Sequence, residues 1–132
     1  MGRLDIDFST SIPIYLQIIS EFKRQIAIGQ LKPGDRMPSQ RDLAAELKVN
    51  ANTVQRAYRE MELLGLVETL RGQGTFVCRG EGVVEETRRE LLDSLVAEFV
   101  AAMRSLGLGG QEALELVRKG FAETAAGKGV ES

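Results

Sequence analysis

The residues best able to recognise a ligand gather near the middle of the chain. Asn52 and Gln55 carry side-chain amides, and Arg56 carries a guanidinium group. Amide side chains can pair with two atoms of adenine, and an arginine can pair with two atoms of guanine. Thr53 and Arg59 have side chains that also bind phosphate. This group predicts base reading in DNA, although a polar helix face is more often only solvated.

One predicted helix carries all of these side chains. Asn50 is expected to cap its N-terminus, and Gly65 follows its end. We therefore place the helix at Asn50–Leu64 and interpret it as a recognition helix. Five apolar residues recur at helical spacing and give it a buried face: Val54, Ala57, Tyr58, Met61 and Leu64.

A shorter helix is predicted just before it. Ser39 is a suitable N-cap, and Asp42 completes a variant capping box. A helix, a short turn and a longer helix are typical of a helix-turn-helix. Ser39, Gln40 and Arg41 would then face the DNA backbone, where helix N-termini and arginines bind phosphate. The alternative is a surface Arg41 paired with Asp42 or Glu46.

A β-hairpin is predicted after the recognition helix. Residues 66–69 and 75–78 are β-type runs, and the glycine-rich residues 70–74 join them. Such a hairpin is the wing of a winged helix-turn-helix, and its tip is slim enough to approach a minor groove. The alternative is an ordinary hairpin turn. The residues of this tip are Arg71, Gly72, Gln73, Gly74 and Thr75.

An amphipathic helix is expected from Pro13 to just before Gly29, after irregular residues 1–11. Its apolar stripe is Tyr15, Ile18, Ile19, Phe22 and Ile26. These elements make residues 1–78 a DNA-binding domain.

Residues 79–132 are predicted to form a helical dimerisation segment. A linker at 79–83 precedes a long helix at 84–106 and a break at 107–110, and residues 126–132 are expected to fray. Between them, a last amphipathic helix is marked by Ala113, Leu114, Val117 and Phe121. The apolar stripe is too wide for a solvated helix, so we expect it to pack on a second copy. Packing within the same chain is the alternative. The dimerisation residues are Leu91, Leu92, Leu95, Val96, Phe99, Val100, Met103, Leu106, Leu114, Val117 and Phe121.

Composition limits the other classes of function. The chain has 132 residues, one Cys and no His, which removes a His-based triad, a His-containing zinc site and an internal disulfide. We predict no cofactor and no metal, and Cys78 is expected to be a small apolar strand residue rather than a redox sensor. Without an export signal or a membrane span, the expected compartment is the cytoplasm.

Charge is distributed unevenly. Residues 1–80 carry 11 Lys or Arg against 9 Asp or Glu, whereas residues 81–132 carry 6 against 10. A mildly basic N-terminal part and an acidic C-terminal part are consistent with an N-terminal part that binds phosphate.

Three strings in the first domain resemble the signature of the GntR superfamily of regulators. They are residues 33–44 (PGDRMPSQRDLA), 49–58 (VNANTVQRAY) and 72–77 (GQGTFV). Residues 13–19 and 29–31 fit the same pattern, so the resemblance covers about residues 8–78. The string NANTVQR at residues 50–56 and the short C-terminal segment resemble the YtrA-type branch.

This resemblance implies a winged helix, homodimerisation through the C-terminal segment and a palindromic operator. By position it implies DNA contacts from Arg41, Asn52, Thr53, Gln55, Arg56 and Gly74. Many relatives carry Arg where this chain has Ala51 and Gln55, which implies an altered sequence preference.

We therefore predict a mainly α protein with a small β-hairpin, acting as a DNA-binding repressor and not as an enzyme. The alternative is a winged-helix module that binds other proteins. Two C-terminal helices cannot by themselves enclose a typical ligand pocket. A small effector bound between two subunits is therefore the remaining alternative for ligand binding.

Overall fold

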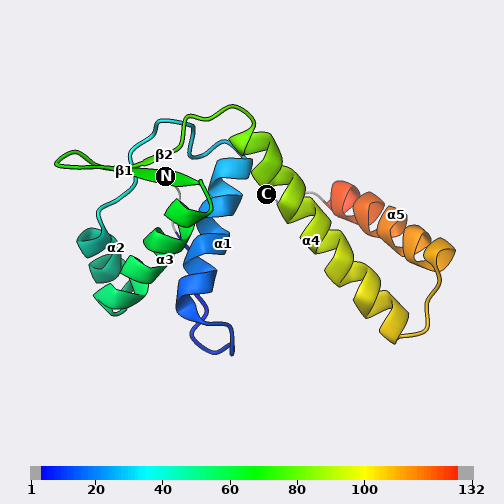
Figure 1. The fold of residues 1–132 in the computed structure, drawn as a ribbon. Coiled ribbons are helices and arrows are strands. Elements are labelled where there is room, and N and C mark those ends of the chain that lie inside the picture. Colours follow the sequence, from blue (N-terminus) through cyan, green and yellow to red (C-terminus); the bar gives the residue numbers. More distant parts are fainter. Residues whose placement is uncertain (1–3, 128–132) are drawn as a thin grey trace. The chain divides into compact units, whose positions relative to one another are not determined.

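The computed structural model describes residues 4–127 and divides into two units, one ending at Leu92 and the other beginning at Asp93. The elements, in chain order (Figure 1), are α1 (Ile14–Ala27), α2 (Gln40–Leu47), α3 (Ala51–Leu63), β1 (Val67–Leu70), β2 (Gly74–Val77), α4 (Val83–Ser105) and α5 (Gly110–Gly127). This confirms the mainly α class with one small hairpin. The division falls inside α4, so the predicted domain boundary at residue 78 stays a prediction.

The core of the first unit lies between α1, α2, α3 and the hairpin. Phe22 of α1 is fully buried and meets Tyr58 of α3 edge to face, with ring centroids 6.1 Å apart. The start of α4 also packs on this core, through Val83 and Val84. Leu4 is 95% buried against it, which the sequence did not predict because residues 1–11 read as merely polar and irregular. The rest of the buried apolar set is Ile18, Ile19, Ile26, Leu31, Met37, Leu43, Ala44, Val54, Ala57, Met61, Leu66, Val67 and Val77.

The helix ends follow the predicted caps. The Ser39 hydroxyl accepts a hydrogen bond from the Asp42 backbone N–H at 3.0 Å, and the Asn50 side chain accepts one from the Asn52 N–H at 2.7 Å. Gly65 follows α3 with a φ of +79°, a backbone conformation that favours glycine. The helix predicted at Asn50–Leu64 therefore runs from Ala51 to Leu63, with Asn50 and Leu64 as its caps.

The hairpin differs from the prediction by one residue on each strand. The strands pair with Val67 opposite Val77 and Leu70 opposite Gly74, leaving a turn of residues 71–73. The Cys78 N–H still donates to the Leu66 carbonyl at 2.9 Å, so hydrogen bonding continues beyond the strand ends. On the other edge of β2, the Met37 N–H donates to the Thr75 carbonyl at 2.7 Å. Both edges of β2 are therefore held.

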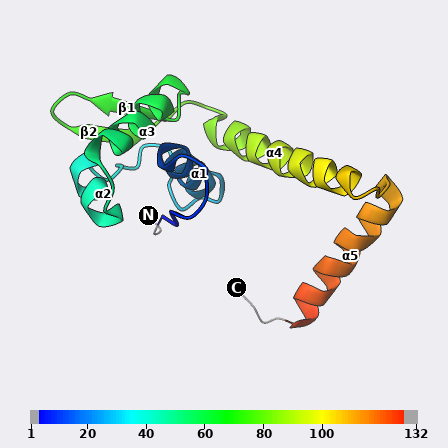
Figure 2. The same ribbon diagram turned by 90° about the horizontal axis from the view of Figure 1, so that it is seen from below.

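The second unit contains the part of α4 from Asp93 onward and the whole of α5. The two helices point in different directions from the loop that connects them (Figure 2). The residues that mark the predicted last helix all lie in α5, but the break predicted at 107–110 is one residue too long, because α5 already begins at Gly110. The Glu112 carboxylate accepts the Gly109 N–H at 3.2 Å and caps that end. Residues 126 and 127, predicted to fray, are the last of α5, and residues 128–132 lie outside the described part of the chain.

Candidate nucleic-acid interface

The polar face of α3 is presented to solvent as predicted. Asn52, Gln55, Arg56 and Arg59 are exposed, and Thr53 is half-buried. The buried face of the same helix is the apolar stripe described above, so core packing sets the orientation of the polar residues. All five of these candidate DNA contacts therefore lie on a helix that its own unit holds in place.

An open groove lies between the polar face of α3 and α2. Gln40 and Arg41 of α2 and Gln55 of α3 line this groove. Three alanines, whose side chains are single methyl groups, line it as well: Ala44, Ala45 and Ala51. Because its side chain is a single methyl group, Ala51 helps to keep this groove open beside Gln55. Within residues 4–127, Arg41 forms no ion pair with Asp42 or Glu46. The predicted phosphate contacts Gln40 and Arg41 thus lie beside Gln55 with their polar groups free.

A second groove lies on the other side of α3, against the start of α1. Pro13, Ile14 and Tyr15 line one wall, and Asn52, Thr53 and Arg56 line the other. The Arg56 guanidinium carbon lies 3.9 Å from the centre of the Tyr15 ring. The sequence placed Tyr15 only in the apolar stripe of α1 and gave no signal for this contact.

The hairpin tip forms a separate part of the predicted set. Arg71, Gly72 and Gln73 are exposed, and the tip extends on the side of the unit where α2 lies (Figures 1 and 2). Gly74 has a φ of +123°, and a Cβ placed there would lie 3.2 Å from the Arg36 guanidinium nitrogens. Arg36 is a cation that sequence reasoning missed, although it stands within the family-like string of residues 33–44.

Two further side chains position α2 and α3. The Tyr58 hydroxyl donates to the Pro38 carbonyl at 2.7 Å, and burial raises the pKa of this phenol, so it remains a donor. The bond ties α3 to the residue just before Ser39, the cap of α2. Asn50 is exposed, but its side-chain oxygen is engaged in capping α3. Its amide nitrogen carries two N–H donors that this cap does not use.

The structure offers little for other chemistry. Burial raises the pKa of the Cys78 thiol, and the charges of Glu68 and Glu62 raise it further, which opposes a reactive thiolate. Among residues 4–127, no group of His, Cys, Asp and Glu could hold a metal ion. No helix in that part of the chain is both long and apolar enough to cross a membrane.

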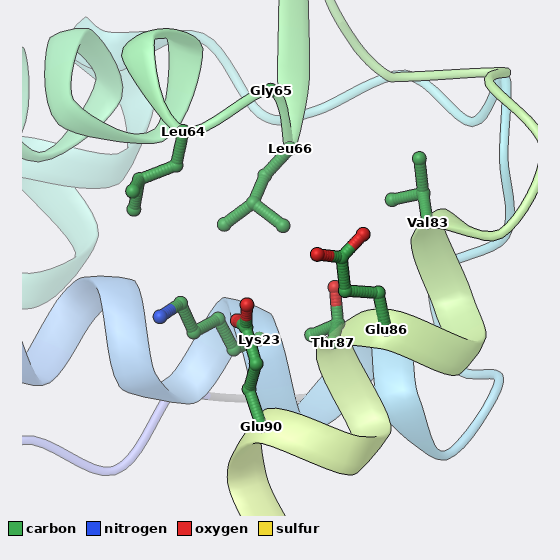
Figure 3. A pocket seen from close by; sticks show the side chains of 8 residues that line it. All are labelled: Lys23, Leu64, Gly65, Leu66, Val83, Glu86, Thr87 and Glu90. Carbon is green, nitrogen blue, oxygen red and sulfur yellow. The ribbon is translucent and has the colours of Figure 1, made fainter.

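A cavity beside the start of α4 lies in the first unit, outside the predicted site. Lys23 of α1, the turn at residues 64–66 and the start of α4 enclose about 200 Å³. Figure 3 shows the Thr87 hydroxyl and the Glu86 carboxylate facing this space. Ligand pockets usually measure about 300–1,000 Å³, so this one is small for an effector.

Comparison with known proteins identifies the family. Residues 14–77 match the family model "Bacterial regulatory proteins, gntR family". The HTH-type transcriptional regulator YhcF of Bacillus subtilis is 44% identical over 87% of this chain and 95% of its own. The transcriptional repressor YtrA of Bacillus subtilis is 33% identical over 95% of this chain and 97% of its own. The chain belongs to the GntR family.

Solved structures agree with this assignment. A GntR-family regulator from Listeria monocytogenes is 33% identical, with a TM-score of 0.79 over 85% of this chain and 98% of that one. The DNA-binding domain of AraR, solved with operator ORX1, is 25% identical, with a TM-score of 0.53 over 59% of this chain and 100% of that one. The relatives are regulators and not enzymes, and the similarity to YtrA over nearly the whole chain supports the YtrA-type branch.

Proposed function

We propose that this GntR-family protein is a transcriptional repressor that binds a palindromic operator as a homodimer in the cytoplasm. The observation that carries the proposal is the polar face of α3, which is exposed and lies between two open grooves. A recognition helix enters the major groove, and the two DNA backbones that border it need space on both sides of the helix. The grooves beside α1 and α2 provide that space.

The roles divide between bases and phosphates. Asn52, Gln55 and Arg56 read base edges, since their side chains make paired hydrogen bonds to adenine or guanine. Contacts to phosphate come from the start of α2 and from the flank of α3, and the hairpin tip approaches a minor groove. The phosphate contacts are Ser39, Gln40, Arg41, Asn50, Thr53 and Arg59, and the minor-groove residues are Arg71, Gly72, Gln73, Gly74 and Thr75.

A homodimer accounts for the apolar side chains that α4 and α5 expose. In the single chain Leu95 is 61% exposed and Phe121 is 75% exposed, which is costly for a helical segment in water. Pairing with a second copy would bury them and would present two copies of α3. Two-fold symmetry in the protein corresponds to a palindrome in the DNA, with half-sites about one helical turn apart. The name of the relative YtrA, a repressor, favours repression over activation.

We propose no small-molecule effector site within the single chain. The cavity of about 200 Å³ beside Lys23 is small, and a site formed between two chains would need the dimer to exist.

Selection from random duplex DNA tests the proposal. The purified chain should enrich a palindrome, and its affinity for that palindrome should fall steeply as salt rises, because phosphate contacts release counterions. Arg56→Ala should lower discrimination between the operator and a single-base variant by about 1–3 kcal/mol, while the dimer stays intact. Arg24→Ala, which removes an exposed cation of α1 that pairs with Glu21, is the matched control.

Two outcomes would count against the proposal. If no sequence is enriched, the protein is better explained as a module that binds other proteins. If Arg56→Ala discriminates between bases as the unmodified chain does, Arg56 is not a base reader.

A further inference from the structure

We infer that Tyr15 determines specificity by holding Arg56 in one orientation at the DNA surface. This inference rests on the proposed function, in which Arg56 reads a base. Tyr15 belongs to α1 and Arg56 belongs to α3, so the contact joins the first helix of the fold to the reading helix.

The distance and the surroundings support this contact. The guanidinium carbon lies 3.9 Å from the ring centre, well inside the roughly 6 Å limit for attraction between a cation and an aromatic ring. The Tyr15 ring is half-buried, and the next turn of α1 is anchored in the core by Ile18 and Ile19. The ring is therefore fixed, whereas the Arg56 side chain is exposed and would otherwise be free to rotate.

No other group restrains Arg56. In the part of the chain that the structure describes, its guanidinium forms no ion pair and no side-chain hydrogen bond. The aromatic face is thus the contact that selects among the many rotamers of this long side chain. Arginine loses rotamer freedom when it binds DNA, so a side chain that is already ordered loses less.

The contact between Arg56 and Tyr15 is compatible with reading a base. A ring covers the flat face of a guanidinium group, but the N–H donors point outward from its edges. The edge of Arg56 therefore keeps the paired donors that guanine requires. Tyr15 would act through Arg56 and would need no contact of its own with a base, so it is a positioning residue.

The contact can be measured first in the protein without DNA. The ring current of Tyr15 should shift the side-chain proton resonances of Arg56 upfield in a two-dimensional NMR spectrum. Tyr15→Phe keeps the aromatic face and should keep the shift, whereas Tyr15→Leu should abolish it. Resonances that are identical in the unmodified chain and in Tyr15→Leu would overturn the inference.

The effect on DNA is measured with a double-mutant cycle on the selected operator. Tyr15→Leu should weaken binding about two- to five-fold and should reduce discrimination at the base pair that Arg56 reads. Tyr15→Phe should bind as the unmodified chain does. In the Arg56→Ala background, Tyr15→Leu should have no further effect.

Several results separate this role from others. An equal loss with Tyr15→Leu in both backgrounds would mean that Tyr15 acts independently of Arg56 and would overturn the inference. A loss with Tyr15→Phe as large as that with Tyr15→Leu would assign the role to the hydroxyl and would also overturn it. These failures leave operator binding by the unmodified chain intact, whereas failure of the proposed function would appear as no enriched sequence at all.

Discussion

The two units of this chain treat their apolar side chains in opposite ways. In the first unit Ile18, Phe22 and Met61 are 0% exposed, whereas in the second Leu95 is 61% and Phe121 75% exposed. Both units are built mainly from helices. The first unit therefore completes its core within one chain, and the second has apolar faces that a single chain leaves uncovered.

This difference separates recognition from assembly. The candidate DNA readers lie on α3, whose orientation is set by a core that needs no second chain. The candidate dimerisation residues lie where a core is still missing. Substitutions in the two units should thus have different consequences, and each prediction below compares them.

The largest expected effect is on the free energy of unfolding. Phe22→Ala should destabilise the first unit by about 3–5 kcal/mol, because it removes a fully buried ring and leaves a cavity. Phe121→Ala is the matched change in the second unit. It should alter the unfolding of the first unit by about 0.5 kcal/mol or less. Urea denaturation followed by circular dichroism measures both, and equal losses would contradict the difference between the units.

The next effect is on assembly. Phe99→Glu places a charge on the apolar face of α4 and should weaken the dimer at least about tenfold, because a charge is costly to bury. Ser94→Glu is the control, because it adds the same charge on the opposite side of α4. The two positions are five residues apart, which separates their side chains by about 140° around the helix axis. Size-exclusion chromatography with light scattering measures both masses. The assignment of this face fails if the two variants give the same mass as the unmodified chain.

The smallest effect concerns the start of α2. Ser39→Ala should cost about 1 kcal/mol of stability, because the Asp42 N–H loses its 3.0 Å hydrogen bond. Gln40→Ala, at the neighbouring exposed position, should be nearly neutral for stability. Thermal unfolding compares the two variants. A neutral Ser39→Ala would show that this cap does not hold the helix.

The sequence predicted the elements with local signals well. Ser39 and Asn50 cap their helices because their short side chains reach the first free N–H groups. Gly65 ends α3 because its backbone adopts a positive φ. Gly110 was predicted to belong to the break before the last helix, since glycines usually interrupt helices. It is instead the first residue of α5, and Glu112 caps that end by accepting the Gly109 N–H.

Contacts between distant segments could not be predicted in the same way. The contact of Arg56 with the Tyr15 ring depends on how α1 crosses α3, which spacing within either helix does not reveal. The position of Arg36 beside Gly74 depends on a loop that joins the edge of β2. Leu4 is buried because the chain before α1 folds back on the core, and no periodic pattern marks it.

The stoichiometry of operator binding tests the central claim most directly. Light scattering measures the mass of the complex on the full palindrome. A binding titration compares the affinity for the full palindrome with the affinity for an isolated half-site. We predict two chains on the palindrome and at least about tenfold weaker binding to the half-site, because one of the two copies of α3 loses its contacts. One chain on the palindrome, with equal affinity for the half-site, would contradict the account.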